Sequence, residues 1–450
     1  MSRHVIYIWS LVGACATTHA TNGPLPAIDE RSTASPDATT LAADEAALAT
    51  RADLAALIRI AMVQNPDIAE ASARVRATHA TAQGTERLPD LELKYEQWGV
   101  PLTRPYALND AATLMIGVRQ TFPAAGVRGA ERNAVDELTA SDASKVVTHR
   151  LDVIHAVTRA YIDYAVAERE RQIHLAHVEL VTQILGLTQD LYRVRKGSEQ
   201  DVLKLQLMLS MLHRDVVTIE LRRRQASIVL NTLAGRAADA PLGPPAEIKP
   251  QRPAAPVAAY EARALARRPE IAAVVHLVKR EDAMIRSATR AGRWPSIMVG
   301  LDYWFQPTSD VRNAYGAMVG INLPWLNGKH QDDVDAAQAA RDAESHAVVS
   351  TQNQVRRQVH EAYAQVAAMI EASRIAHEDL EPAAKHSLDA ARAAYGSGAG
   401  DALAVLDALR SLLDVRLDQV RADAEIARAI ADLERAAGDD VASIEKRGAP

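Results

Sequence analysis

Cysteine is almost absent from this sequence, because Cys15 is the only one in 450 residues. A lone cysteine cannot form an internal disulfide, which excludes a disulfide framework and any site built on several cysteines. Sequence signatures of catalysis are lacking as well: there is no Gly-rich phosphate loop, no G-x-S-x-G and no H-E-x-x-H. We therefore predict a protein that is not an enzyme and that holds neither a cofactor nor a metal ion.

Aromatic residues are also scarce, at 4% of the chain, whereas charged residues make up 24% and alanine is abundant. This composition favours long exposed helices over a thick aromatic core, so the molecule should be elongated. The formal net charge of −6 comes without a basic stripe along any face. The densest basic run, at 222–224, is typical of a solvated helix face, and we therefore expect no nucleic-acid partner.

Hydrophobic runs long enough to span a bilayer as a helix are lacking throughout. The N-terminus has only a short apolar segment, residues 5–12, which follows a basic start and is typical of an export signal. It ends in Val12-Gly13-Ala14-Cys15, which is similar to a bacterial lipobox. We predict a lipoprotein signal peptide at 1–14, a lipid-modified Cys15 and an extended tail at 15–50. Ordinary cleavage after Ala20, which would discard Cys15, is the alternative.

What the sequence does contain is an internal repeat at a spacing of 203 positions. The segment Pro66-Asp67-Ile68 recurs as Pro269-Glu270-Ile271, and Tyr192 with Gly197 recurs as Tyr395 with Gly400. A helix-opening proline and a glycine turn recur together, so a whole structural unit is duplicated. We predict a first repeat at 51–240, a linker at 241–255, a second repeat at 256–440 and a C-terminal tail at 441–450.

Four segments alternate apolar and polar residues with a period of two, which predicts strands at 90–99, 112–122, 296–305 and 314–323. Each has about the ten residues that a tilted strand needs to cross a bilayer. Four strands cannot close a barrel, since the smallest membrane barrels use about eight, so a membrane location requires several chains. Three chains would supply twelve strands. A sheet in water with one wet face is the alternative that the pattern leaves open.

Long helices should fill most of each repeat. No proline occurs from residue 124 to residue 195, a stretch that would reach about 108 Å as one helix. In the second half a seam steps by fours and threes, as in paired helices, through Val355, Val359, Ala362, Val366, Met369, Ser373, Ala376 and Leu380. Pro382 should kink that helix. Each long helix then reverses at a glycine turn, at 196–198 and at 396–400.

His174 and His177 share one face of the first long helix, where they could begin a metal site. No acidic residue or histidine lies one turn further along that face. We interpret both as structural histidines of the surface.

The export signal, the twofold repeat, the strands of membrane length and the long hairpins together resemble the bacterial outer membrane factor (TolC) family. The resemblance covers residues 54–440 and is carried by Asn65-Pro66-Asp67-Ile68, Gln120-Thr121-Phe122-Pro123, Tyr192 to Leu203, Leu323-Pro324 and Tyr395 to Leu406. Within the family, the sequence is most similar to the branch of heavy-metal and drug exporters. It implies a mainly α fold in which three chains share a twelve-stranded outer-membrane β-barrel, continued by a periplasmic α-barrel.

The resemblance also implies a function and partners. A homotrimer of this family is the passive exit duct of a tripartite efflux or type I secretion-like system, and it works with a periplasmic adaptor protein and an inner-membrane pump. The family's gate lies at the periplasmic helix tips. Carried over by motif, the gate and pore ring are Tyr395, Gly400, Asp401, Asp407, Gln200 and Asp201, and the adaptor-contacting tip residues are Lys196, Gly197, Ser198, Ser397 and Gly398. Gly400 stands where some members have a lock-forming arginine.

A second hypothesis is a lipid-anchored periplasmic coiled-coil adaptor or scaffold. It shares the lipobox and the long hairpins, but it has no need of four amphipathic strands of bilayer length. Extraction from membranes discriminates between the two.

Overall fold

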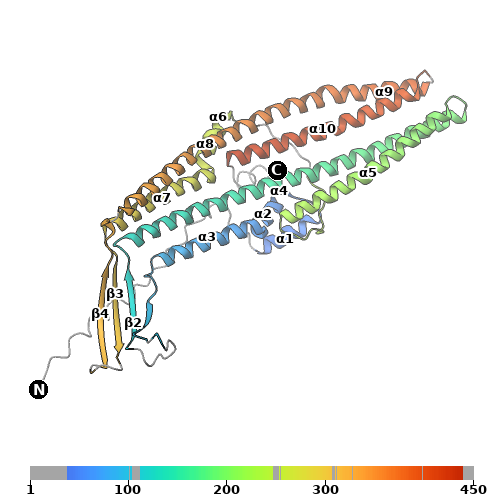
Figure 1. The fold of residues 1–450 in the computed structure, drawn as a ribbon. Helices are drawn as coiled ribbons and strands as arrows, with labels where there is room; N and C mark the ends of the chain where they lie inside the picture. Colours follow the sequence, from blue (N-terminus) through green and yellow to red (C-terminus); the bar gives the residue numbers. More distant parts are fainter. Residues whose placement is uncertain are drawn as a thin grey trace.

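The computed structural model describes residues 38–438, except 101, 104–111, 247–252, 254, 307–309, 311, 327 and 398. The predicted signal peptide, Cys15 and the C-terminal tail lie outside the described residues. Figure 1 shows an elongated molecule with a bundle of long helices. A small sheet lies at one end, and the turns that join the long helices in pairs lie at the other. The predicted fold class, mainly helical with long hairpins and four antiparallel strands, is confirmed.

The sheet consists of β1 (Glu92–Trp98), β2 (Thr113–Phe122), β3 (Ile297–Phe305) and β4 (Asn313–Ile321), paired antiparallel in that order. Side chains alternate between its two faces. The outer face is apolar and exposed, and it includes Leu93, Ile116, Leu301, Tyr315 and Val319. The inner face is shielded, and it includes Met115, Gly117, Met298, Gly300, Asp302 and Met318. Within the described residues, the outer edges of β1 and β4 have no strand partner, so the sheet is open.

Two helical hairpins form the rest of the rod. The first consists of α4 (Val127–Arg193), which is 67 residues long, and α5 (Glu199–Leu233), which returns alongside it. The second consists of α8 (Lys329–Ile375), a π-helical turn η4 (Ala376–Leu380), α9 (Glu381–Ser397) and α10 (Ala402–Ala437). At 1.5 Å per residue, α4 alone is about 100 Å long. In the described residues, no helix is both long and apolar enough to cross a membrane.

Shorter helices pack against the long ones in the half of the bundle that is next to the sheet. They are α2 (Leu54–Gln64), α3 (Pro66–Thr85), α6 (Val257–Arg267), α7 (Pro269–Arg293) and the 3₁₀ turn η3 (Pro324–Leu326). Helix α3 packs along α4, and α7 packs along both α4 and α8 (Figure 1). The strands therefore continue directly into a bundle of long helices.

The expectation of an extended tail at 15–50 was wrong for its last part, because residues 38–48 form α1 (Ala38–Leu48). This helix has almost no amphipathic pattern, so its sequence gives no local signal. Tertiary contacts hold it instead: Asp44 accepts hydrogen bonds from Arg59 of α2 at 2.8 and 2.9 Å, and Glu45 pairs with Arg236 at 2.8 Å. Leu48 at its end is fully buried.

The seam predicted along α8 is correct up to η4 and wrong beyond it. Val355, Val359 and Val366 are buried as expected, but Leu380 is 46% exposed. A π-helical turn inserts one extra residue, which rotates all that follows out of the earlier phase. Pro382 lacks the amide hydrogen that an uninterrupted helix requires at this point. The Gln419 side chain of α10 donates to the Ala376 carbonyl oxygen at 3.1 Å within the turn.

The duplication recurs at the level of single hydrogen bonds. Helices α5 and α10 end in left-handed glycines, Gly235 and Gly438, which are 203 positions apart. The Asn65 side chain donates to the Leu233 carbonyl oxygen at 2.9 Å, and Arg268 donates to the equivalent Ala436 oxygen at 3.1 Å. In both halves, the residue that precedes the helix-opening proline thus caps the end of the returning helix.

Candidate gate at the helix tips and membrane surface of the sheet

The first tip turn, between α4 and α5, is closed by backbone geometry. Arg195 adopts a left-handed conformation with φ 57°, and the Lys196 amide donates to the Leu191 carbonyl oxygen at 2.8 Å. A capping box then starts α5: the Asp201 amide donates to Ser198 Oγ at 3.1 Å, and the Ser198 amide donates to Asp201 Oδ2 at 3.4 Å. The carboxylate of Asp201 is therefore engaged in its own helix, whereas Gln200 is exposed.

The second tip turn, between α9 and α10, repeats the first. The Ala399 amide donates to the Ala394 carbonyl oxygen at 3.0 Å, which is the repeat equivalent of the bond from Lys196 to Leu191. Asp401 caps α10 by accepting from the Leu403 amide at 3.2 Å, and Ser397 Oγ donates to Ala394 at 3.0 Å. Gly398 lies outside the described residues.

Gly400 allows a close approach of the chain within this turn. A Cβ there would lie 2.9 Å from Ala394 Cβ and 2.9 Å from the Tyr395 nitrogen. The equivalent distances at Gly197 are 3.3 Å to Leu191 Cβ and 3.3 Å to the Tyr192 nitrogen. An arginine at position 400 would therefore require the turn to shift.

Tyr395 faces the interior between the two hairpins. It is only 6% exposed, and its hydroxyl donates to Thr188 Oγ1 of α4 at 3.3 Å. It belongs to an apolar cluster that joins both hairpins near the tips, with Val181, Ile184, Leu205, Met208, Leu388, Val405, Leu406 and Leu409. The equivalent Tyr192 of the first hairpin is exposed. The structure thus brings Tyr395 into the contact that holds the tips together.

Asp407 lies on the exposed side of α10, and it has no ion-pair partner among the described residues. Asp414, one heptad further along, is exposed on the same face of the helix. Lys196 and Ser397 are exposed at the two turns, and Gly197 is half-buried there.

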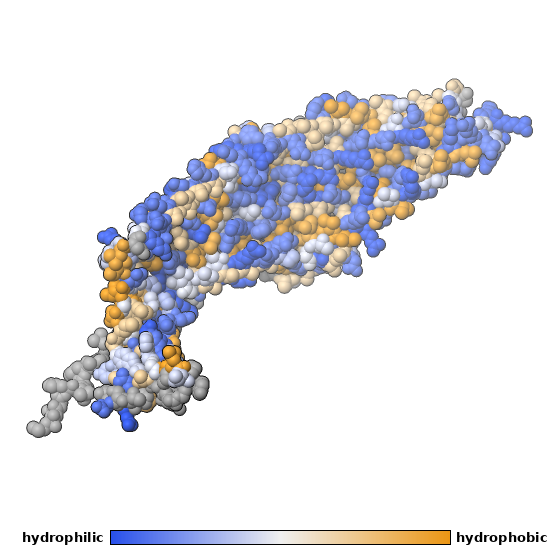
Figure 2. Space-filling model, in the orientation of Figure 1, coloured by the Kyte–Doolittle hydropathy of each residue, from blue (hydrophilic) through white to orange (hydrophobic). Residues whose placement is uncertain are grey.

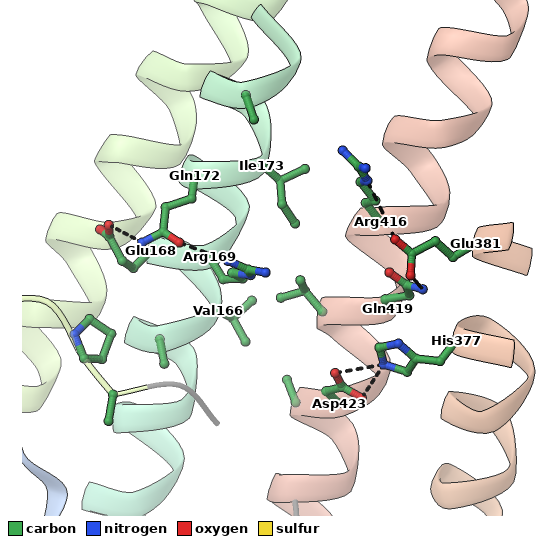
Figure 3. Close-up of a pocket in the computed structure, with 16 residues that line it drawn as sticks. Val166, Glu168, Arg169, Gln172, Ile173, His377, Glu381, Arg416, Gln419 and Asp423 are labelled. Atoms are coloured by element: carbon green, nitrogen blue, oxygen red, sulfur yellow. Dashed lines mark hydrogen bonds and ion pairs between the residues drawn. The ribbon is translucent and has the colours of Figure 1, made fainter. Parts of the chain in front are cut away.

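A polar cavity of about 680 Å³ lies between α4 and the second hairpin. Figure 3 shows Glu168, Arg169 and Gln172 of α4 on one side, facing His377, Glu381, Arg416, Gln419 and Asp423 on the other. Its charges are mostly paired: His377 Nε2 lies 3.1 Å from both carboxylate oxygens of Asp423. Burial raises the pKa of Glu168, but hydrogen bonds from Arg171 and Gln172 outweigh it and lower that pKa below its usual range. Ion pairs and hydrogen bonds of this kind stabilise the packing of the helices. The groups engaged in them are not available as nucleophiles.

His174 and His177 are buried, so their interpretation as surface histidines was wrong. His174 Nδ1 donates to the Glu170 carbonyl oxygen at 3.0 Å, whereas Nε2 of His177 has no hydrogen-bond partner in the part of the chain that is described. Burial, with the positive neighbours His174 and Arg416, lowers the pKa of His177 to about 4. Among the described residues, no three histidine, cysteine or acidic side chains are grouped so that they could hold a metal ion.

The outer face of the sheet presents apolar side chains that none of the described residues covers. Leu93 is 74% exposed and Tyr315 is 88% exposed, and the other apolar side chains on that face, such as Ile116, Leu301 and Val319, are exposed as well. Figure 2 shows hydrophobic residues gathered at the edge of the sheet. An exposed apolar face of this kind marks contact with lipid or with another protein.

Comparison with known proteins agrees with this geometry. A family model described as "Outer membrane efflux protein" matches residues 262–439. The outer-membrane channel OprN is 20% identical with a TM-score of 0.71, covering 86% of this chain and 90% of that chain. CusC, described for its folding and transmembrane channel formation, is 19% identical with a TM-score of 0.73, covering 86% and 92%. The open state of the MtrE outer membrane channel of Neisseria gonorrhoeae is 21% identical with a TM-score of 0.67, covering 86% and 88%. None of the curated proteins matches the sequence.

An open sheet with an apolar outer face, continued by helical hairpins about 100 Å long, is the fold that this chain shares with these solved outer membrane channels. The second half of the chain thus matches the model of the outer membrane efflux protein family, and the whole described chain is similar in fold to solved outer membrane channels. The predicted likeness in fold is therefore confirmed.

Proposed function

We propose that three copies of this chain form a closed twelve-stranded barrel in the outer membrane, with β1 of each chain paired to β4 of the next. The open four-stranded sheet with an apolar outer face is the observation that carries this proposal. Unpaired edge amides and carbonyls are too costly in lipid, and a closed barrel needs about eight strands or more. Head-to-tail pairing of identical edges completes such a ring.

Exposed apolar residues along α5 support the same assembly. They recur at helical spacing on the side that α4 leaves uncovered, at Leu203, Leu207, Met211, Val217 and Leu221. An uncovered apolar stripe on a helix favours packing against another helix. In the proposed trimer, the neighbouring copy covers this stripe, and the hairpins form a tunnel that continues the barrel into the periplasm.

The gate in this proposal is the ring of helix tips, with Tyr395, Gly400, Asp401, Asp407, Gln200 and Asp201. The apolar cluster around Tyr395 and its bond to Thr188 keep the two hairpins together, so opening requires these contacts to separate. A periplasmic adaptor would spread the two hairpins by contacting their tips at Lys196, Gly197, Ser198, Ser397 and Gly398. Energy comes from an inner-membrane pump, because the duct itself is passive.

Two finer assignments belong to the same proposal. The lipobox sequence before Cys15 supports a lipid anchor at that residue. The motifs at 65–68, 120–123 and 395–406 support a place in the heavy-metal and drug exporter branch of the family.

Membrane extraction and mass measurement test the assembly. After Cys15→Ser, the mature protein should still require detergent for extraction, because the outer face of the sheet and not the lipid holds it in the membrane. Light scattering of the detergent complex should give three chains. The wild-type protein serves as the control for extraction. A Cys15→Ser protein that is monomeric and stays in aqueous buffer would favour the lipid-anchored scaffold and overturn the barrel.

A further inference from the structure

The two hairpins of one chain meet along a seam between α4 and α10, and ion pairs hold this α4–α10 seam together. Acidic residues of α4 face arginines of α10 at successive levels. The pairs are Asp152 with Arg435 at 2.7 Å, Asp163 with Arg428 at 2.6 Å, and Glu170 with Arg421 at 3.1 Å. Asp432 of α10 also accepts from Arg159 of α4 at 2.8 Å. Complementary charges thus join the first half of the chain to the second.

The internal repeat gives the residues of this seam equivalents in the other half. Helices α5 and α10 are related by 203 positions, as their terminal glycines show. Helices α4 and α8 begin after the left-handed glycines Gly126 and Gly328, which are 202 positions apart. Val153 and Val355, also 202 apart, are both buried. The extra residue of the π-helical turn η4 accounts for the difference of one, so the equivalents of the α4–α10 seam lie on α8 and α5.

Apolar residues of α5 are exposed at positions that are buried on α10. Ala424 and Ala431 lie one turn from the arginines of the α4–α10 seam, on the same side of α10, and are buried. Their equivalents on α5 are the larger Leu221 and Ile228, which are 57% and 39% exposed. Large apolar side chains at such positions indicate a surface that another chain covers. Since α4 lies on this side of α10, its equivalent α8 is the helix suited to lie on this side of α5.

Complementary charges do not recur at the equivalent positions. The residues equivalent to the three ion pairs are exposed and uncharged: Gln354 with Thr232, Gln365 with Gln225, and Ala372 with Thr218. Arg357 and Glu361 of α8 pair with each other at 3.2 Å. A copy of α5 placed on α4 would leave the acidic residues of α4 without their arginines, which costs free energy. The charges therefore distinguish the seam within a chain from a seam between copies.

Two glycines next to the sheet show the same relation. Arg290 of α7 donates to the Gly126 carbonyl oxygen at 2.8 Å, and its guanidinium lies 2.6 Å from the place of a Cβ on that glycine. Nothing among the described residues lies within 4 Å of the same place on Gly328. The residue 203 positions before Arg290 is Arg87, which follows α3, is exposed, and has no side-chain partner among the described residues. An arginine and a glycine thus remain unmatched at positions whose equivalents are in contact.

We propose that the interface between neighbouring copies repeats the interface between the two halves of one chain. Helix α5 of each copy lies against α8 of the next in the register that brings Gln225 beside Gln365, and Arg87 donates to the Gly328 carbonyl oxygen of that neighbour. The same neighbour supplies β4 to β1. The inference rests on the proposed trimer and adds the helices that meet, their register, and Arg87 as the residue that positions them. Because this seam is uncharged at these positions, the burial of Leu221 and Ile228 stabilises it.

Cysteine cross-linking of the purified protein in detergent tests the register. In a Cys15→Ser background no native thiol remains. The matched pairs Gln225→Cys/Gln365→Cys and Thr218→Cys/Ala372→Cys should give covalent dimers and trimers with a short bifunctional thiol reagent. The crossed pairs Gln225→Cys/Ala372→Cys and Thr218→Cys/Gln365→Cys use the same positions but are displaced by about 10 Å along the helices, so they should link about tenfold less.

Arg87→Gln tests the contact next to the sheet. Loss of a charged donor should speed the exchange of subunits between labelled and unlabelled trimers by about tenfold. Arg293→Gln changes another exposed arginine, at the end of α7, and should exchange as the wild type does. Exchange at the wild-type rate in Arg87→Gln would remove Arg87 from the interface.

The outcomes separate the register from the trimer itself. Equal linking in matched and crossed pairs would overturn the register. Matched pairs that give only monomer bands, in a protein whose mass is that of three chains, would overturn the register as well and leave the proposed barrel standing. A monomer that needs no detergent would refute the trimer, and this interface with it.

Discussion

His177 is buried on α4, its Nε2 has no hydrogen-bond partner among the described residues, and burial lowers its pKa to about 4. This folded-state pKa lies below the 6.5 of the unfolded chain, so neutral His177 contributes stability above pH 6.5. That contribution is lost as the pH falls toward 4, because the unfolded chain binds the proton more readily. The loss amounts to about 3 kcal/mol at most, since one pKa unit corresponds to about 1.4 kcal/mol.

We predict that His177→Leu reduces the acid destabilisation of the protein. A leucine has no proton to take up, so the difference in thermal midpoint between pH 7.5 and pH 4.5 should shrink relative to the wild type. Circular dichroism of the detergent complex measures this midpoint. His213→Leu, at an exposed position of α5, is the matched control and should leave the difference unchanged. Equal acid sensitivity in His177→Leu and wild type would show that His177 is not the responsible group.

At the scale of the element, the ends of the returning helices depend on residues from the start of each repeat. Arg268 is buried, donates to the Arg435 and Ala436 carbonyl oxygens at 3.1 Å, and pairs with Glu270 at 2.9 Å. Burial raises the pKa of Glu270, but Arg435 and Arg268 outweigh it and hold that pKa below its usual range. Asn65 does the same capping in the first half with a neutral amide.

Arg268→Ala should destabilise the protein by about 2 to 4 kcal/mol, because it removes the side-chain donor to the Ala436 carbonyl oxygen and one of the two guanidinium partners of Glu270. Arg268→Asn should recover part of this loss. The equivalent Asn65 both reaches the end of α5 and accepts from the Asp67 amide at 2.9 Å, so asparagine fits both tasks in this backbone. Chemical unfolding compares the variants, with the exposed Arg267→Ala as control. If Arg268→Asn were no more stable than Arg268→Ala, the two caps would not be equivalent.

The helices and strands were largely predictable from the sequence, because the spacing of apolar residues and the prolines and glycines that end an element are local signals. Alternation in the segment around Leu301 and the helix stop at Pro295 were enough to locate β3. The predictions that were wrong concerned features that depend on contacts with residues distant in the sequence. Helix α1 is held by Arg59 and Arg236, and the phase change that exposes Leu380 comes from a π-helical turn with no sequence pattern of its own. That Asp302 lies diagonally between Met115 and Met318 on one face of the sheet follows only from the strand register.

At the scale of the whole molecule, the proposed threefold assembly would bring three copies of each tip residue around one axis. Asp407 is exposed and unpaired within the described residues, so its charge is available to a central passage. A ring of carboxylates at a narrow point favours cations over anions. Tip residues therefore matter to permeation only in the assembled protein, and one chain cannot reveal their effect.

Asp407→Asn should lower the cation preference of the channel in planar bilayers. The measurement is the reversal potential under a salt gradient, which should move toward zero when the ring loses its charge. Asp389→Asn changes an equally exposed carboxylate of α9 and should leave the potential unchanged. An unaltered reversal potential in Asp407→Asn would remove Asp407 from the conducting path and leave the barrel itself untouched.

The matched turns and caps of the two halves also bear on ancestry. Each half contains two strands, one long hairpin and its own cap, so six copies of a half-length ancestor would supply all the parts of the proposed trimer. Fusion of two such halves makes them alternate around the ring of the proposed trimer. The sequences of the two halves can then diverge independently. This divergence is already visible: Tyr395 is buried where Tyr192 is exposed, and Asp401 occupies the position that Ser198 holds in the other half.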